Sequence, residues 1–218
     1  MKNILNVFEK ELGLVCNTNQ YVELSMRLIQ KSCSIGLDNA ELLKVIARGN
    51  GLSITSYTSD VFQNVFFCYL TMIHSCFQDF LKSYEKLVGS EVYGKTYNNR
   101  DDMGHLKWIV REMKNDPDSL EKDAINICEY YRLLRNDFIH SGEENSRLKT
   151  AYSMLTNVAE AFKKSKMSHT LNAPNGVGCL NYDDQVLFSR ATIIVAKLAL
   201  HQHVWVASPP FFVDFRLN

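Results

Sequence analysis

Residues 59–88 read SDVFQNVFFCYLTMIHSCFQDFLKSYEKLV, a stretch without proline or glycine. Large apolar side chains recur in it every three or four residues, the spacing that gathers them on one side of an α-helix. Gly89 is predicted to end this helix. The apolar face is wide enough for a central element of a helical bundle, and its members are Phe62, Val65, Phe66, Tyr69, Ile73, Phe77, Phe80 and Leu81.

The same helical spacing runs through the rest of the chain, which contains only four prolines in 218 residues. Because proline interrupts helices, long segments can continue as helix without a break. The sequence therefore predicts an all-α protein, an up-and-down helical bundle with an N-terminal helical extension. Besides the long central helix, helices are predicted approximately over residues 3–14, 19–34, 39–49, 101–115, 118–140, 145–166 and 183–206.

The predicted helices fall into three segments. Residues 1–58 form the N-terminal helical extension, residues 59–207 the bundle, and residues 208–218 a C-terminal tail. Within the bundle, residues 167–182 are rich in loop-forming residues and are predicted to be a mobile loop.

Capping residues mark several of the predicted helix ends. Asp118-Ser119 and Asp183-Asp184 lie at helix starts, where carboxylates and hydroxyls accept hydrogen bonds from free backbone N–H groups. Gly49 is predicted to close the helix that begins near Asn39.

The composition limits the classes of function. The 24 Lys and Arg residues balance 24 Asp and Glu residues, so no overall positive field attracts nucleic acid, which argues against a bulk RNA coat protein. A ribonuclease is still allowed because it needs only a few cations at its cleft. The six cysteines form no C-x-x-C pair and mostly lie in apolar helical patterns, which predicts reduced core thiols in a soluble cytoplasmic protein. No signal peptide, membrane span, metal or organic cofactor is expected.

One hexapeptide combines an arginine and a histidine near the end of the helix predicted over residues 118–140. It reads Arg135-Asn136-Asp137-Phe138-Ile139-His140. Asn136 and His140 are one helical turn apart, whereas Arg135 and His140 are separated by about 140° around the axis. Arg135 therefore reaches the same site as His140 only if the helix bends or a partner closes over it.

The two sides of this helix differ in character. The arc that carries Arg135, Asn136, Ile139 and His140 is predicted to be a surface that faces a partner. The opposite arc is predicted to be the core face and contains Ile127, Tyr130, Tyr131, Leu134 and Phe138.

The hexapeptide resembles the signature of the HEPN superfamily, the higher eukaryotes and prokaryotes nucleotide-binding domains. Members of that family are helical bundles in which an arginine is followed four to six residues later by a histidine, often with a polar residue directly after the arginine. Arg135-Asn136-x-x-x-His140 matches the R-N-x-x-x-H form. The motif itself covers about ten residues, and the predicted helical frame from Ser59 to Val206 agrees with the family.

The resemblance implies a metal-independent endoribonuclease that cuts RNA at a composite site between the two copies of a homodimer. Its catalytic residues would be Arg135, Asn136 and His140, with no metal or organic cofactor, and its products would carry a 2′,3′-cyclic phosphate and a 5′-hydroxyl. Family members commonly serve prokaryotic toxin–antitoxin or antiviral defence systems. The resemblance therefore also implies a regulated activity and a protein partner such as an antitoxin.

The three residue types suit this chemistry. RNA cleavage without a metal needs a base for the 2′-hydroxyl proton, an acid for the leaving 5′-oxygen and a cation for the phosphorane charge. Histidine works as acid or base near neutral pH, and the arginine fork matches phosphate oxygens. Arg135 is thus a phosphate clamp and Asn136 an orienting group. His140 remains either base or acid, because a helix C-terminus and a nearby arginine shift its pKa in opposite directions.

Two other interpretations remain open. In the first, the chain is a catalytically inactive helical binding or dimerisation module, in which Arg135 and His140 hold a dimer or a nucleotide. In the second, the chain is an unrelated helical protein that binds a partner, and the arc of Arg135 is ordinary solvent-exposed surface.

Several other residues have competing explanations. Arg100 and His105 repeat the motif spacing, but an acidic pair and a glycine between them argue against a site. His74 either lines the same cleft as the motif or is a partly buried structural histidine. A group of cations forms either a basic edge that guides RNA or a solvated helix face, and its members are Arg147, Lys149, Lys163, Lys164 and Lys166.

Overall fold

The computed structural model describes residues 2–33, 39–53, 59–92, 104–111, 116–139, 146–162 and 172–203. Over these residues the chain forms seven α-helices and no strand, which confirms the predicted all-α class. The helices are α1 (Lys2–Cys33), α2 (Asn39–Gly49), α3 (Ser59–Val92), α4 (His105–Arg111), α5 (Ser119–Ile139), α6 (Ser146–Phe162) and α7 (Tyr182–His203).

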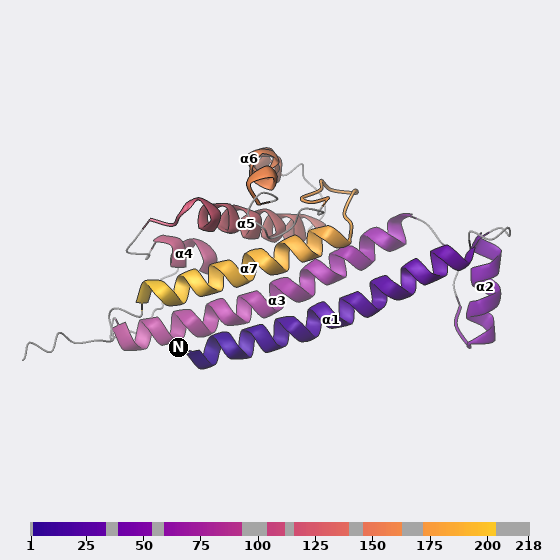
Figure 1. Ribbon diagram of the computed structural model, residues 1–218, viewed down its shortest axis with the longest axis horizontal. Helices are drawn as coiled ribbons and strands as arrows, with labels where there is room; N and C mark the ends of the chain where they lie inside the picture. The colour runs from indigo at the N-terminus through magenta and orange to yellow at the C-terminus, as the bar shows by residue number, and fades with distance from the viewer. Residues whose placement is uncertain are drawn as a thin grey trace, which may run out of the picture.

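Three long helices, α1, α3 and α7, run alongside one another and pack together (Figure 1). Helix α5 lies on the side of α3 and α7 away from α1, with α6 packed against it and α4 against α3. Helix α2 stands at the far end, beside the C-terminal end of α1 (Figure 1). The order of the chain thus places the motif-bearing helix α5 on one side of the central helices and α1 on the other.

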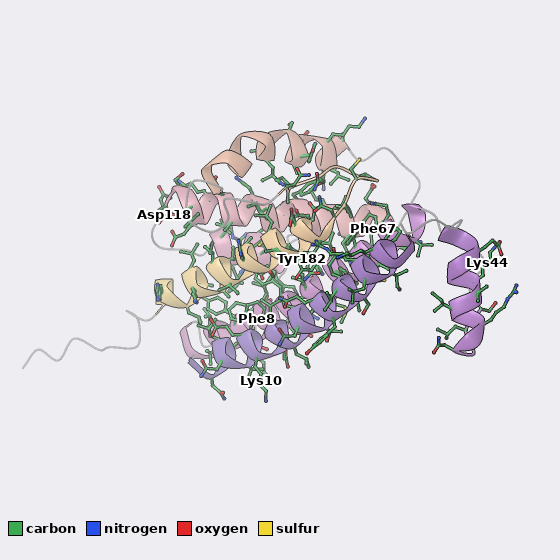
Figure 2. The ribbon with its side chains drawn as sticks, turned by 45° about the vertical axis from the view of Figure 1, so that its right-hand side comes forward. Phe8, Lys10, Lys44, Phe67, Asp118 and Tyr182 are labelled. Atoms are coloured by element: carbon green, nitrogen blue, oxygen red, sulfur yellow. The ribbon has the colours of Figure 1, made fainter. Side chains whose placement is uncertain are left out.

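The aromatic face of α3 forms the centre of the core, as predicted. Phe66, Tyr69, Ile73, Phe77, Phe80 and Leu81 are all buried, while Phe62 and Val65 are partly buried. Phe8 of α1 packs against this face, with its ring centroid 5.0 Å from that of Phe80 and 6.1 Å from that of Phe77 (Figure 2). Burial of these large rings is the main source of stability for the contact between α1 and α3.

The prediction of two helices over residues 3–14 and 19–34 is wrong, because α1 is one continuous helix. Its middle contains residues with modest helix propensity, which suggested a break. Packing against α3 and α7 outweighs this propensity, since most helical stability in proteins comes from tertiary contacts. Phe8 and Leu12 belong to the same core as α3, α5 and α7, so α1 packs on the bundle itself.

Of the two helix ends predicted at glycines, the one at Gly49 is confirmed and the one at Gly89 is wrong. Helix α3 continues through Gly89 to Val92, so the predicted end at Gly89 is wrong. A glycine inside a helix costs about 1 kcal/mol relative to alanine, and burial of Tyr84 and Val88 just before it offsets that cost.

Helix α2 does end at Gly49, but the left-handed residue that completes its cap is Gly51, with φ 70°. Leu52 N donates to Ala47 O at 2.8 Å across this turn.

The predicted cap of α5 is confirmed. Asp118 Oδ1 accepts a hydrogen bond from Glu121 N at 2.8 Å, and Asp118 N donates to Glu121 Oε2 at 2.8 Å. This reciprocal pair satisfies two backbone N–H groups that have no partner inside the helix, so it defines where α5 begins.

Helix α7 has a similar start. Asn181 Oδ1 accepts a hydrogen bond from Asp183 N at 2.8 Å, and Asn181 N donates to Asp184 Oδ2 at 2.9 Å. Asp184 therefore has the capping role predicted for the Asp183-Asp184 pair. In the preceding loop, residues 172–181 are tied to the bundle, because Leu180 N and O both pair with the amide of Gln63, each at 2.9 Å.

The cysteines are less buried than predicted. The five cysteines whose side chains the structure describes are free thiols, and Cys128 alone among these five is fully buried. Cys68 and Cys179 are exposed, so core packing does not account for them. No helix in the described ranges has both the length and the apolar character that crossing a bilayer requires.

Candidate functional site

The motif lies at the C-terminal end of α5, where the structure describes Arg135 and Asn136. His140 lies outside the described residues, so its distance from Arg135 is untested. The core face of α5 is largely as predicted, because Ile127, Tyr130, Tyr131 and Leu134 are buried. Helix α5 is held through this face against α7 and α6, and it also contacts α3.

Phe138 departs from the predicted core face, since it is 45% exposed. Its ring stacks on Phe67 of α3 with centroids 3.9 Å apart and an angle of 11° between the planes. The last turn of α5 therefore contacts α3 through a half-exposed ring at the edge of the core. This contact fixes the position of Arg135 and Asn136 relative to α3.

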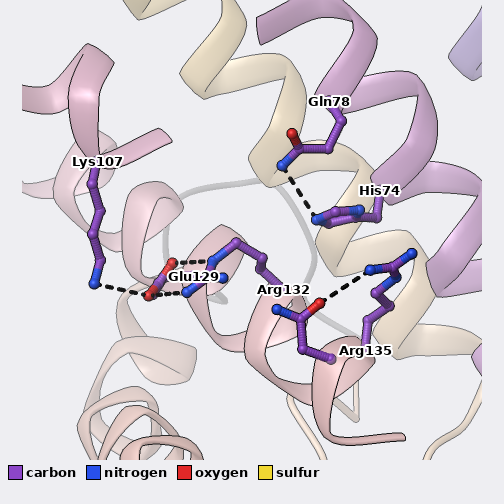
Figure 3. A network of polar contacts seen from close by, with 7 residues as sticks. His74, Gln78, Lys107, Glu129, Arg132 and Arg135 are labelled. Atoms are coloured by element: carbon purple, nitrogen blue, oxygen red, sulfur yellow. Dashed lines mark hydrogen bonds and ion pairs between the residues drawn. The ribbon is translucent and has the colours of Figure 1, made fainter. Parts of the chain in front are cut away.

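Arg135 does not project outward as predicted. Its side chain is partly buried, and its guanidinium is directed toward His74 of α3 (Figure 3). Arg135 Nη1 donates to Asn136 Oδ1 at 3.1 Å. Arg135 Nε is buried and has no hydrogen-bond partner among the residues that the structure describes. Arg135 is partly buried because α5 packs against α3, which places this side of α5 next to a neighbouring helix rather than in solvent.

His74 is the residue of α3 that faces this guanidinium. It is 8% exposed, and the amide Nε2 of Gln78 lies 3.4 Å from its Nε2 (Figure 3). Burial lowers the pKa of His74 to about 4, and the charges of Arg135, Arg132 and Lys82 act in the same direction. At neutral pH the imidazole is therefore uncharged, with Nε2 as the hydrogen-bond acceptor when the Gln78 amide donates.

Arg132, one turn before Arg135, has a different environment. Its Nε and Nη2 each donate to the Glu129 carboxylate at 2.7 Å, and Lys107 of α4 lies 3.5 Å from the same group (Figure 3). Burial opposes the charge of Glu129, but the hydrogen bonds from Arg132 and the two nearby cations lower its pKa overall. Arg132 is thus occupied by a carboxylate of its own helix.

The contrast between the two arginines defines what the site can do. Within the described ranges, no carboxylate lies at ion-pair distance from Arg135. An arginine guanidinium stays charged in proteins and offers a planar set of donors that fits phosphate oxygens. Arg135 therefore keeps a charge without a counter-ion in the described part of the chain, next to the Asn136 amide and a neutral imidazole. Such a group is suited to bind an anion.

The competing motif at Arg100 and His105 is structural as far as the structure describes it. His105 is 7% exposed, and its Nδ1 lies 2.5 Å from Oε2 of Glu85, itself 5% exposed. This buried pair joins α4 to α3, and Arg100 lies outside the described residues. The proposed basic edge is only partly visible: Arg147 and Lys149 are exposed on α6, and the three lysines at 163, 164 and 166 lie outside the described residues.

The sequence offered two explanations for His74, a residue of the cleft or a partly buried structural histidine, but it did not identify Arg132. The spacing of three residues between Arg132 and Arg135 was a usable signal, because it places both on the same side of a helix. Among the described residues, no group of three or more His, Cys, Asp and Glu side chains could hold a metal ion. Comparison with protein-family models, curated protein sequences and solved structures found no match to this chain.

Proposed function

We propose that the protein is a metal-independent endoribonuclease of the HEPN type, with Arg135, Asn136 and His140 as its catalytic residues. The observation that carries this proposal is the state of Arg135, which lies at the end of α5 with its Nε unpaired and with no carboxylate partner among the described residues. Keeping a partly buried cation without a counter-ion is costly, and an incoming phosphate would remove that cost.

The proposed reaction assigns one role to each residue. Arg135 binds the scissile phosphate and stabilises the charge that develops on it. Asn136, whose Oδ1 accepts from Arg135 Nη1 at 3.1 Å, orients the guanidinium. His140 removes the 2′-hydroxyl proton or protonates the leaving 5′-oxygen. The 2′-oxygen bonds to phosphorus, the bond from phosphorus to the 5′-oxygen breaks, and the products carry a 2′,3′-cyclic phosphate and a 5′-hydroxyl.

His74 supports this site as a positioning residue. Because its imidazole is neutral at physiological pH, it packs beside Arg135 without adding a second positive charge. A bound phosphate would partly cancel the charge of Arg135 and so raise the pKa of His74. Phosphate binding at Arg135 thus has a readout that does not depend on cleavage.

The biological setting is also part of the proposal. We place the enzyme in the cytoplasm, acting on RNA as a homodimer in a prokaryotic toxin–antitoxin or antiviral defence system, under the control of an antitoxin or similar protein. The alternative is a catalytically inactive helical module in which the same arginine binds a nucleotide or holds a dimer.

The direct test is cleavage of total RNA or transfer RNA in excess chelator by the wild type, Arg135→Ala and His140→Ala. Both variants are expected to lose at least about a hundredfold in rate, the usual contribution of a general acid or base or of a charge-stabilising donor. Arg132→Gln is the matched control, because it removes an arginine one turn away that already has a carboxylate partner. Equal cleavage by all four proteins would refute the assignment.

A second test separates binding from catalysis. The pKa of His74, followed by NMR, is expected to rise above about 4 when a non-cleavable 2′-deoxy oligonucleotide is added to the wild type, and to stay unchanged in Arg135→Ala. A shift without any RNA cleavage would favour the inactive binding module. No shift would argue against phosphate binding at Arg135.

A further inference from the structure

A row of large apolar side chains is exposed along α1, on the side that faces away from the bundle. We call it the α1 stripe. Figure 2 shows Lys10 projecting from this side of α1, while Phe8 points into the core. The stripe consists of Val7 (49% exposed), Leu14 (70%), Tyr21 (74%), Leu24 (54%) and Leu28 (56%).

The spacing of the stripe is that of a coiled coil. Val7, Leu14, Tyr21 and Leu28 are seven residues apart, and Leu24 follows Tyr21 by three. Seven residues fall about 20° short of two full turns, so a strict seven-residue repeat keeps facing a partner only if that partner is another helix in a left-handed supercoil. In heptad terms the four residues occupy a positions, and the d positions are Lys10, Asn17, Leu24 and Lys31.

The d positions indicate the direction in which two α1 helices would pair. In a parallel pair of α1 helices, Lys10 and Lys31 would each face their own copies, which like-charge repulsion disfavours. In an antiparallel pair, a positions face d positions. Leu14 then lies opposite Leu24 of the second copy, and Asn17 opposite Tyr21. The lysine stems cover the apolar ends of the stripe while their ammonium groups reach solvent.

The area of the stripe agrees with a stable pair. With roughly 150 Å² for each large side chain, complete burial of the five exposed side chains in both copies would remove about 900 Å² of apolar area from solvent. Since apolar atoms supply roughly 60% of an interface, the pair would bury about 1,500 Å² in total, within the usual range for specific complexes. We propose that the α1 stripe pairs antiparallel with the same stripe of a second copy of this chain.

This interface is separate from the proposed ribonuclease site. Helix α1 and helix α5 lie on opposite sides of α3 and α7 (Figure 1), so pairing through α1 cannot bring two Arg135 residues together. If the composite site also forms, the protein has two interfaces and assembles beyond a dimer. Substitutions in the stripe change the mass, and substitutions at Arg135 change cleavage, so the two proposals fail independently.

The first test is the mass of the full chain in solution, by light scattering at micromolar concentration. The double variant Tyr21→Glu/Leu24→Glu is expected to halve the particle mass, because it places charges in the centre of the stripe. Val45→Glu on α2, at a position 62% exposed, is the matched control and is expected to leave the mass unchanged. Circular dichroism should show the same helix content in all three proteins. A monomeric wild type, or an unchanged mass in the double variant, would overturn the proposal.

The second test checks the direction of pairing. Leu14→Cys and Leu24→Cys are prepared separately, mixed and oxidised gently. The antiparallel arrangement predicts a cross-linked species of twice 25.0 kDa in the mixture well above its level in either variant alone or in the wild type, which has cysteines of its own. Cross-linking of each variant with itself, at the level of the mixture, would refute the antiparallel pair.

Discussion

Replacing one oxygen of the Asp184 carboxylate should change the stability of the protein by an amount that can be estimated and measured. The carboxylate is fully buried and accepts four hydrogen bonds. Oδ1 accepts from Tyr131 Oη at 2.7 Å and from Asn175 N at 2.8 Å, while Oδ2 accepts from Asn175 Nδ2 and from Asn181 N, both at 2.9 Å. The carboxylate thus joins the core tyrosine of α5, the loop before α7 and the first turn of α7.

Asp184→Asn keeps the size of the side chain but offers a single acceptor oxygen. Its NH₂ group would face two donors, so two hydrogen bonds to a charged acceptor are lost, each worth about 1.5–3 kcal/mol. Burial raises the pKa of Asp184 against the opposing effect of the hydrogen bonds, and removing the charge recovers part of the loss. We expect a net loss of about 3 kcal/mol in the free energy of unfolding, or about 6–12 °C in Tm for a chain of this length.

The assay is thermal and urea unfolding at neutral pH, with Asp183→Asn as the control. Asp183 is the same residue type one position earlier, is only partly buried, and accepts a hydrogen bond from Asn172 N at 2.8 Å. Its substitution should cost less than about 1 kcal/mol, because solvent can replace that contact. Equal destabilisation by the two substitutions would refute the argument that the four buried donors make Asp184 important.

Three further predictions concern other parts of the fold. Because the pKa of His74 is lowered from 6.5 to about 4 in the folded state, the unfolded chain binds the proton first as the pH falls. Acidification from pH 6.5 to pH 4 should therefore cost the wild type about 3 kcal/mol in the free energy of unfolding. The variant His74→Gln should not show this loss, and urea unfolding at both pH values measures the difference. Asp118→Ala should lower the free energy of unfolding by about 1 kcal/mol through loss of the α5 cap, and an unchanged urea midpoint would contradict this. His105→Leu should cost about 3 kcal/mol because it removes the ring paired with the buried carboxylate of Glu85; thermal unfolding tests this, and a change below about 1 kcal/mol would mean that the pair contributes little.

Much of the architecture could be predicted from local patterns. The aromatic positions of α3 recur at helical spacing, so their burial on one face follows from helix geometry alone. The start of α5 at Asp118 is equally local, since a capping box involves only residues three apart. By contrast, neither the continuity of α1 nor that of α3 through Gly89 could be predicted, because both depend on packing that outweighs local propensity.

The candidate site shows the same division. The sequence identified Arg135 and Asn136 as polar residues on the non-core side of a helix, and the structure describes them at the end of α5. It could not show that the guanidinium turns toward His74, because these residues come from helices far apart in the chain. Nor could it show which of the two arginines has a carboxylate partner among the described residues, since that depends on the side-chain conformations that place Glu129 against Arg132.

The all-helical class, the apolar faces and the candidate residues of the proposed site follow from the amino-acid order alone, because helix periodicity, capping and functional-group chemistry act over a few residues. The folded chain adds the neutral state of His74, a buried Nε of Arg135 that has no hydrogen-bond partner among the described residues, and the exposure of the α1 stripe. These three properties depend on which distant segments pack against each residue. Burial, electrostatic fields and solvent exposure are therefore set only once the helices have packed.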